Sequence, residues 1–317
     1  KKTAVLYKDV LKECATVCLE MGQHSLFFPG GARSRSGAVE QNLKKGLIGT
    51  SIRAYIGNLR AGNPKPNIYV VPCTISYTLV LEAETLIADH LTETGKSRYI
   101  FEDDEFNRPR RVYKFLSNLI SLDARTVIRF SSPIDIVGNF VDEEGNSLDC
   151  RGRRVDSSRY VFHDGEPVYD GQRDFQYTTE LANSVCRAYL RDNVIHSTNL
   201  VAYTVFNMLR DQNPEIDLYR LLRTGGKGAS FSVKDVCKEV ERVLSAIREG
   251  KEGPQLDSSL NGRDARGILN DALKAFGAYH TRPAMVRRGG RVFHEDRNLI
   301  LYYSNRLKGY DLEEELV

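Results

Sequence analysis

Apolar residues at the start of the chain follow helical and strand-like patterns in turn. They recur at helical spacing over residues about 5–21, and Gly22 marks the end of that helix. The apolar run Leu26–Phe28 predicts a short strand, and a second helical stripe follows at 47–59. The run Ile68–Val71 is too apolar to alternate, so we predict a strand that is buried on both faces.

The order of these elements predicts the fold class. Further patterns indicate helices at about 79–95 and 109–120 and a strand at about 125–130. The order α-β-α-β-α-α-β favours an α/β fold with a partial, mostly parallel sheet flanked by helices. In such sheets ligands bind beyond the carboxyl ends of the strands, where we expect the site.

The second half of the chain has a different pattern. Residues about 138–173 lack apolar periodicity, and we interpret them as an extended polar connection with room for a short hairpin. Residues 285–293 predict a β-hairpin that turns at Gly289-Gly290. We therefore divide the chain into the C-terminal part of an α/β domain (1–137), the connection (138–173) and a helical C-terminal domain (174–317). Its predicted helices lie at 181–189, at 200–209 with Ser197 or Thr198 as cap, at 233–247, at 268–276 and at 299–307.

Composition places the chain among globular proteins. It has 317 residues, of which 41% are hydrophobic and 27% charged, enough for about two domains. The net charge of +3 is too small to indicate nucleic-acid binding by itself. Arginines cluster at 108–111, 151–154 and 287–291, and we interpret each cluster as a solvated loop that an anionic lipid surface would attract.

The cysteines and the absence of long apolar runs indicate the compartment. Six cysteines are scattered without a Cys-x-x-Cys pair, which is typical of a reducing cytoplasm. Cys14 and Cys18 share a predicted helix face with Leu11, so we expect core thiols. No run approaches the roughly 18 apolar residues of a spanning helix. We predict a cytoplasmic protein, and we expect the chain to be the remainder of something longer.

The stretch 27–37, Phe-Phe-Pro-Gly-Gly-Ala-Arg-Ser-Arg-Ser-Gly, carries the clearest candidate chemistry. Its glycines let the backbone approach a ligand closely, and its arginines offer planar forks of donors that suit phosphate. It is neither a P-loop nor a dinucleotide fingerprint. We interpret residues 27–37, the Arg-Ser loop, as a phosphate-holding loop after a strand, and a solvated Gly/Ser/Arg turn remains the alternative.

Four segments, in order, resemble the glycerol-3-phosphate acyltransferases and related glycerolipid acyltransferases. Residues 27–37 are similar to the family's Phe-Pro-Glu-Gly-Thr/Gly-Arg-Ser-Arg-Ser/Thr-Gly loop, and Lys44-Lys45-Gly46 to a following Lys-x-Gly. The other three segments are Val71–Tyr77 (Val-Pro-x-x-Ile-x-Tyr), Arg129–Ile134 (Phe-Gly-x-Pro-Ile) and Leu301–Leu307 (Tyr-Tyr-x-Asn). The resemblance covers nearly the whole chain.

The resemblance implies acyl transfer from acyl-CoA or acyl-carrier protein to the 1-hydroxyl of glycerol 3-phosphate, in phospholipid biosynthesis at a membrane surface. Lysophosphatidate and dihydroxyacetone phosphate remain alternative acceptors. No other cofactor and no metal are expected. The residues assigned to the acceptor's phosphate are Gly31, Arg33, Ser34, Arg35 and Ser36, and those assigned to the substrate pocket are Gly30 and Pro72.

The catalytic base of the family is not found in this sequence. In the family it is the His of a His-x-x-x-x-Asp motif upstream of the Arg-Ser loop, and none of the six histidines here has an acidic residue five positions later. We assign no catalytic residue, give His24 and His163 no role, and expect the chain alone to be inactive. Gly30 stands where the family has Glu, and Ala32 where it has Thr or Gly. A divergent active subfamily and a degenerate one both remain open.

A second hypothesis is a nucleic-acid-binding module. The predicted helices within 232–278, followed by the hairpin at 285–293, resemble a winged helix in outline, and Arg287, Arg288 and Arg291 are placed to touch phosphates. The small net charge and the ordered acyltransferase motifs argue against it, so we expect no nucleic-acid partner. A docking or membrane-facing role for the helical C-terminal region is a third possibility.

Overall fold

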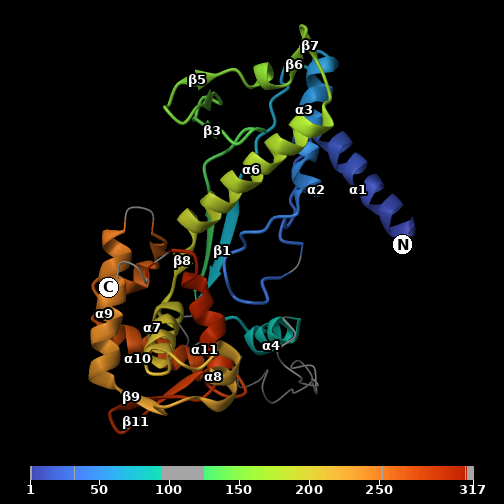
Figure 1. Ribbon diagram of the computed structural model, residues 1–317. Coiled ribbons are helices and arrows are strands. Elements are labelled where there is room, and N and C mark those ends of the chain that lie inside the picture. The colour runs from blue at the N-terminus through green and yellow to red at the C-terminus, as the bar shows by residue number, and fades with distance from the viewer. Residues whose placement is uncertain (1, 32, 94–124, 251–252, 311, 313–317) are drawn as a thin grey trace. The chain divides into compact units, whose positions relative to one another are not determined.

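The computed structural model describes residues 2–31, 33–93, 125–250, 253–310 and 312, and its helices and strands are shown in Figure 1. The predicted helix at 109–120 and the arginines at 108–111 lie outside the described residues. The chain forms two compact units, between which it passes repeatedly. The first unit comprises Lys1–Arg33, Glu40–Thr74 and Arg129–Tyr189, and the second unit comprises Ser34–Val39, Ile75–Ile128 and Leu190–Val317.

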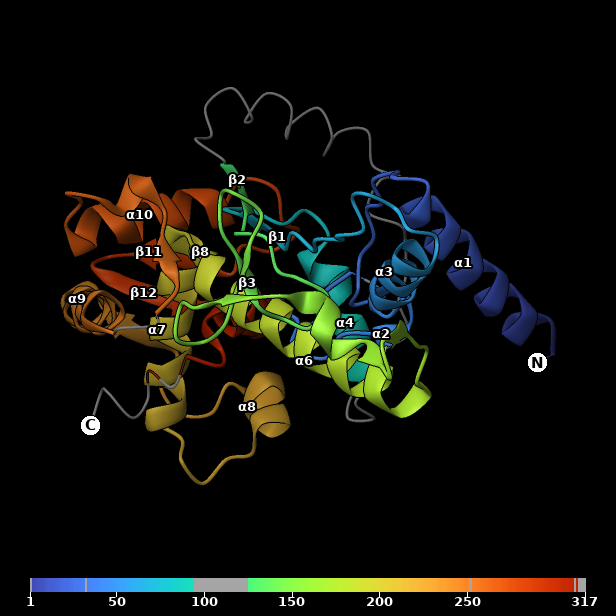
Figure 2. The ribbon, with the colours of Figure 1, turned by 90° about the horizontal axis from the view of Figure 1, so that it is seen from above.

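The fold is mixed α/β, with small sheets in both units (Figure 2). The first unit holds α1 (Lys2–Glu20), α2 (Lys45–Ile48), α3 (Thr50–Arg60), β3 (Phe140–Val141), β4 (Ser147–Leu148), β5 (Arg154–Val155), a 3₁₀ helix (Ser157–Tyr160), β6 (Phe162–His163), β7 (Glu166–Pro167) and most of α6 (Gly171–Asp192). The second unit holds α4 (Ala83–Glu93), β8 (Val194–Ile195), α7 (Ser197–Asp211), α8 (Leu218–Thr224), β9 (Ser230–Ser232), α9 (Val233–Glu249), β10 (Gln255–Leu256), a 3₁₀ helix (Ser258–Leu260), α10 (Ala265–Phe276), β11 (Met285–Arg288), β12 (Arg291–His294), α11 (Arg297–Ser304) and a 3₁₀ helix (Asn305–Leu307). Strands β1 (Cys73–Tyr77) and β2 (Thr126–Phe130) each cross from one unit to the other.

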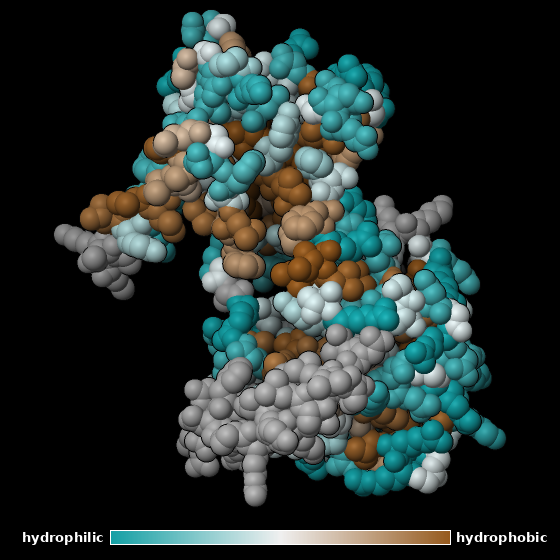
Figure 3. Space-filling view, turned by 180° about the vertical axis from the view of Figure 1, so that it is seen from behind, coloured by the Kyte–Doolittle hydropathy of each residue, from teal (hydrophilic) through white to brown (hydrophobic). Residues whose placement is uncertain are grey.

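Helix α1 forms and ends as the pattern predicts. Gly22 has φ +73°, and the N–H of Gln23 donates to the Cys18 carbonyl at 2.9 Å, which closes the helix with a left-handed cap. Its apolar stripe, however, is not buried: Val10 is 58% exposed and Cys14 is exposed. The expectation that Cys14 is a core thiol is therefore wrong. Helix α1 packs against α3, and apolar side chains appear in brown along its open side in Figure 3.

Two predicted strands are not formed as expected. Leu26–Phe28 is extended without a ladder partner among the described residues, and Leu26 and Phe28 are 85% and 74% exposed. Within Ile68–Val71, only Val70 makes a bridge, to Ile134, and alternate side chains are exposed. The prediction of a strand buried on both faces is wrong, because only one face of this segment is covered in the part of the chain that the structure describes.

The sheets are mainly antiparallel, and a mostly parallel sheet is not seen among the described strands. Strand β1 pairs with β2, and hydrogen bonds from Thr78 N to Arg125 O (3.0 Å) and from Ser131 N to Pro72 O (2.8 Å) show that the two strands run in opposite directions. The sheets β3-β4-β5 and β11-β12-β9 are also antiparallel, as is the pair of β6 and β7, and of the described strand pairs only β8 and β10 run parallel. Most of the described antiparallel pairs are joined by short turns, which cannot make the crossovers of a parallel sheet. The expectation of a site at parallel strand ends therefore loses its basis.

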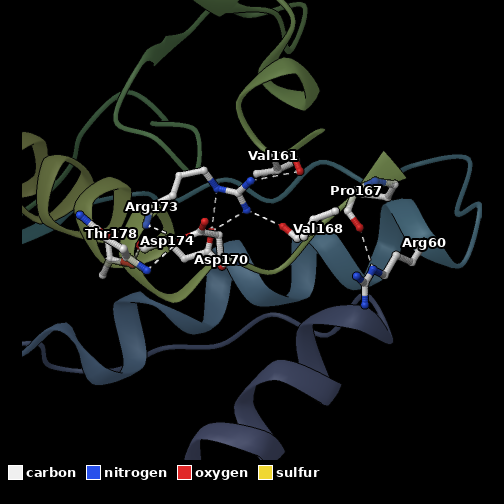
Figure 4. A network of polar contacts seen from close by, with 9 residues as sticks. Arg60, Val161, Pro167, Val168, Asp170, Arg173, Asp174 and Thr178 are labelled. Carbon is white, nitrogen blue, oxygen red and sulfur yellow. Dashed lines mark hydrogen bonds and ion pairs between the residues drawn. The ribbon is translucent and has the colours of Figure 1, made fainter. Parts of the chain in front are cut away.

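The predicted polar connection folds into two small antiparallel sheets that a polar network holds in the first unit. In Figure 4, the Arg173 guanidinium donates to the Val161 carbonyl at 3.3 Å and to the Asp174 carboxylate at 2.8 Å. Nearby, Arg60 Nε donates to the Pro167 carbonyl at 2.8 Å. These contacts satisfy loop carbonyls at the start of α6, so they order a segment with few apolar anchors.

Helix α7 lies at the centre of the second unit, where it packs against α9, α10 and α11. It begins where the pattern predicts, but its N-cap residue is His196 and not Ser197 or Thr198; the N–H of His196 donates to Asn199 Oδ1 at 3.1 Å. The predicted hairpin is confirmed as β11 and β12. Its turn residues Gly289 and Gly290 have φ +54° and +80°, the left-handed pair that a two-residue turn requires.

Candidate functional site

The Arg-Ser loop begins in the first unit with a tight turn. The N–H of Gly31 donates to the Phe28 carbonyl at 3.0 Å, and Gly31 has φ +75°, a conformation that glycine adopts without strain. The N–H of Lys44 donates to the Pro29 carbonyl at 2.8 Å. The turn is therefore tied to the segment that precedes α2, and the Gly31 amide assigned to phosphate is engaged inside the turn.

Two charged side chains cover the glycines of this turn. A Cβ placed on Gly30 would lie 3.3 Å from both Cγ and Oε2 of Glu40. A Cβ placed on Gly31 would lie 2.3 Å from Lys44 Nζ, so any side chain there displaces the lysine. The sequence alone assigned no role to Glu40 or Lys44. The only signal was the short Lys-x-Gly segment after the loop.

The rest of the loop belongs to the second unit, where its polar side chains are occupied. Ser34 Oγ donates to the Ala38 carbonyl at 2.8 Å, and Ser36 Oγ accepts the N–H of Ala38 at 3.2 Å. The Arg35 guanidinium forms an ion pair with Glu93, at the end of α4. The two hydroxyls thus shape the loop itself, and an anion that binds Arg35 must compete with a carboxylate.

The Tyr-Tyr-x-Asn segment contacts the loop from the other end of the chain. Asn305 Nδ2 donates to the Ser36 carbonyl at 2.8 Å. Gly37 has φ +81°, and a Cβ there would lie 2.1 Å from the Tyr302 carbonyl oxygen. The close approach of these two backbones requires glycine at position 37.

The same segment also contacts the Val-Pro-x-x-Ile-x-Tyr segment. Arg306 Nη2 donates to the Ile75 carbonyl and to Ser76 Oγ, each at 3.0 Å, and burial lowers the pKa of Arg306. The Tyr303 hydroxyl accepts the N–H of Val80 at 3.1 Å, and burial raises the pKa of Tyr303. In the second unit, parts of three segments that carry the resemblance therefore meet.

Pro72 lies in the first unit, where it lines an apolar cavity of about 130 Å³. The cavity lies among α1, α2, α3, α6 and the extended segments at 25–29 and 68–72. Its lining includes Leu19, Phe27, Pro29, Ile48, Val71 and Val185. Pro72 and Pro29 thus line the same apolar cavity, whereas Gly30, the other residue assigned to the substrate pocket, is not among its lining residues.

A buried histidine, His196, lies beside an aspartate, Asp257, and the sequence alone did not indicate this pair. His196 Nδ1 lies 3.6 Å from Asp257 Oδ2 and 3.2 Å from Thr78 Oγ1. These residues are far apart in sequence, so no short motif indicates them. His196 is only 1% exposed, and burial lowers its pKa while Asp257 acts in the opposite direction. Since the imidazole is out of reach of a substrate, we do not assign it as a base. His24 and the His163–Asp164 pair are exposed, and neither receives a role.

Comparisons with known proteins add no family: no family model matches the chain, and no curated protein is similar to it. Within the described residues, no group of three or more His, Cys, Asp or Glu side chains is arranged to hold a metal ion. None of the described helices is both long and apolar enough to cross a membrane.

Proposed function

We propose that the chain contains the acceptor-binding part of a glycerolipid acyltransferase, which transfers an acyl group from acyl-CoA or acyl-carrier protein to the 1-hydroxyl of glycerol 3-phosphate. One observation carries the proposal. The Tyr302–Leu307 segment contacts both the Arg-Ser loop, through Asn305 and Ser36, and the Ile75-Ser76 segment, through Arg306. Segments that resemble one family in sequence thus also meet in space.

The reaction needs three groups. The phosphate of the acceptor needs cations, which Arg33 and Arg35 supply. The hydroxyl nucleophile needs a general base, and the developing oxyanion needs donors. Because no accessible His–Asp pair with the family's spacing is present in this sequence, the proposal assigns the base to a polypeptide segment outside it.

Such a segment has a surface to pack on in the first unit. The extended run Leu26–Phe28 offers backbone groups without a ladder partner among the described residues, and α1 exposes Leu6 and Val10. An added strand satisfies these backbone groups and covers apolar area. We place the assembled enzyme at the cytoplasmic surface of a membrane, as a peripheral protein.

The test is thermal stabilisation of the 317-residue chain by glycerol 3-phosphate, with glycerol as the uncharged control. Arg33→Ala and Arg35→Ala are expected to reduce the stabilisation, whereas Arg151→Ala, in an exposed turn, leaves it unchanged. Equal stabilisation of all four proteins contradicts the phosphate site. Acyl transfer by this chain alone is expected to be undetectable, and measurable turnover contradicts an external base.

A second candidate function is duplex-DNA binding by the second unit, and the strand order favours it. Helices α9 and α10 lie in the chain between β9 and β11, and the sheet order β11-β12-β9 is that of a winged helix. Arg266, Asn270 and Lys274 are exposed at intervals of four residues on α10, and Arg287 Nη1 lies 3.5 Å from Asn270 Oδ1.

Fluorescence anisotropy with a labelled duplex tests this candidate. Salt-dependent binding that Lys274→Ala and Arg266→Ala weaken is the expected result, because each phosphate contact releases counterions. Lys308→Ala, outside this surface, is the control. If the duplex does not bind at low salt, DNA binding by this unit is excluded.

A further inference from the structure

We propose that Lys44 and Glu40 together select a glycerol phosphate as the acceptor: the Lys44 ammonium binds the phosphate, and the Glu40 carboxylate accepts a hydrogen bond from the acceptor's 2-hydroxyl. The inference rests on the proposed function and names the acceptor of that same site. Both residues belong to the first unit, together with Gly30, Gly31 and Arg33.

The Lys44 ammonium is held in place but not neutralised. Its backbone is fixed by the hydrogen bond to the Pro29 carbonyl, and its side chain lies over the bare face of Gly31. Among the described residues, its Nζ has no hydrogen-bond or ion-pair partner. Lys45, the next residue, differs: its Nζ donates to Thr179 Oγ1 at 2.9 Å and lies 4.8 Å from the centre of the Phe175 ring. Lys44 therefore keeps its charge available to an anion that approaches the turn.

The Glu40 carboxylate is also held on one side only. Its Oε1 accepts the N–H of Asn42 at 2.9 Å, which fixes the side chain, while Oε2 faces Gly30. In the described part of the chain, Oε2 accepts no hydrogen bond. Because Gly30 has no side chain, this oxygen lies beside bare backbone, 3.3 Å from where a Cβ of residue 30 would be. A carboxylate oxygen without a donor is suited to a hydroxyl.

The two charges lie over adjacent residues, whose Cα atoms are ~3.8 Å apart. Glu40 and Lys44 nevertheless do not pair with each other in the described structure. A ligand that carries an anion and, a few bonds away, a hydroxyl group satisfies both. Glycerol 3-phosphate has a 2-hydroxyl at this place. Dihydroxyacetone phosphate has a carbonyl there, which cannot donate and places one acceptor against another.

Physical precedent gives the size of the discrimination. A site built to bind a hydroxyl group discriminates strongly against an analogue that lacks it, because its own polar group is left without a partner. Here Glu40 is half-exposed, so water replaces part of that loss and a moderate preference is expected. Of the two residues Lys44 and Glu40, only Lys44 attracts inorganic phosphate, and Glu40 repels it.

Isothermal titration calorimetry on the 317-residue chain tests the proposal with three ligands: glycerol 3-phosphate, dihydroxyacetone phosphate and inorganic phosphate. Lys44→Gln is expected to weaken the binding of all three ligands by about tenfold, since it removes a charged hydrogen bond. Lys45→Gln removes the same charge one residue away and is expected to change affinity less than about twofold.

Glu40→Gln separates the second half of the proposal from the first. This substitution is expected to weaken the binding of glycerol 3-phosphate about fivefold and to leave the binding of inorganic phosphate unchanged or tighter. The preference for glycerol 3-phosphate over dihydroxyacetone phosphate therefore falls by about fivefold or more. Glu143→Gln, an exposed glutamate in the first unit, is the control and leaves the preference unchanged.

Each contrary result has its own meaning. The inference is overturned, while the proposed function stands, if Lys44→Gln weakens phosphate binding no more than Lys45→Gln does. The same holds if Glu40→Gln leaves the preference for glycerol 3-phosphate over dihydroxyacetone phosphate unchanged. If the unmodified chain binds inorganic phosphate but not glycerol 3-phosphate, both the inference and the proposed function are overturned. Circular dichroism of each variant confirms that it is folded before affinities are compared.

Discussion

The Asn305 side-chain amide donates a hydrogen bond to the Ser36 backbone carbonyl at 2.8 Å, across 269 residues of chain. The bond joins the end of α11 to the Arg-Ser loop within the second unit. We expect Asn305→Ala to lower the free energy of unfolding by about 1 kcal/mol, because it removes one partner of a half-buried hydrogen bond. Urea unfolding measures the loss. Asn261→Ala, at an exposed turn, is the matched control, and equal stability of the two variants would contradict a role for the bond.

Gly37→Ala is expected to be more damaging than Asn305→Ala. The new methyl group would need a left-handed φ of +81° and would meet the Tyr302 carbonyl oxygen at 2.1 Å, so one of the two backbones must move. We expect a loss of about 2 kcal/mol or more. Gly62→Ala is a control, since Gly62 has a similar φ of +66° but nothing within 4 Å of its Cβ position. A similar loss in both variants would mean that the contact with Tyr302 contributes nothing beyond the backbone strain.

Glu93→Gln is expected to raise the affinity of the chain for inorganic phosphate. In the structure the Glu93 carboxylate pairs with the Arg35 guanidinium, and the side chains of Arg35 and Glu93 are 37% and 63% exposed. Exposed ion pairs contribute up to about 1 kcal/mol, which sets an upper limit of about fivefold on the gain. Titration calorimetry measures it, with Asp89→Asn on the same helix as control. An unchanged affinity in Glu93→Gln would show that Arg35 is not part of the anion site.

The buried side chain of His280 makes the stability of the folded chain depend on pH. Burial lowers the pKa of His280 from 6.5 to about 4, and the Glu84 carboxylate, 4.0 Å from Nδ1, acts in the opposite direction. Nε2 lies 2.9 Å from the Tyr303 hydroxyl. In the unfolded chain the imidazole takes up a proton near pH 6.5, whereas the folded chain resists it until about pH 4. The contribution of His280 is therefore complete above pH 6.5 and is lost as the pH falls from about 6.5 to about 4.

Urea unfolding at intervals from pH 7.5 to pH 4 on the unmodified chain and on His280→Asn measures this contribution. The variant is expected to be less stable at neutral pH and to show a flatter profile. His24→Asn, at an exposed site, should keep the slope of the unmodified chain. Parallel profiles for the unmodified chain and His280→Asn would show that another group governs the acid sensitivity.

Periodicity predicted most of the helices, since the side chains that repeat along one face are also those that pack. Helix α9 buries Val236, Val240 and Val243, which lie on one face, and α10 buries Ile268, Leu269 and Ala272 in the same way. The hairpin of β11 and β12 followed from its Gly-Gly turn alone. These predictions use neighbours within four residues, so the sequence contains all that they need.

Strand burial and the candidate site depend on distant neighbours. Val71 is exposed although its run is apolar, because burial is set by what covers a strand and not by the strand itself. The positions of Glu40 and Lys44 over the Gly30-Gly31 turn follow from side-chain packing between segments with no periodic pattern. The proximity of His196 to Asp257 follows from the folding of the second unit. Neither relationship leaves a local signature in the sequence.

The repeated passage of the chain between its units has a consequence for how the protein is made. The first unit needs residues up to Tyr189, and the second unit needs both Ser34–Val39 and the far C-terminal half. Neither unit is a continuous stretch of the gene product, so neither can be completed on the ribosome before most of the chain has emerged. Truncation after Tyr189 leaves every residue of the first unit in place and removes a large part of the second unit. All residues of the first unit are thus present once Tyr189 has been made, whereas the second unit begins earlier in the chain, at Ser34, and is completed later.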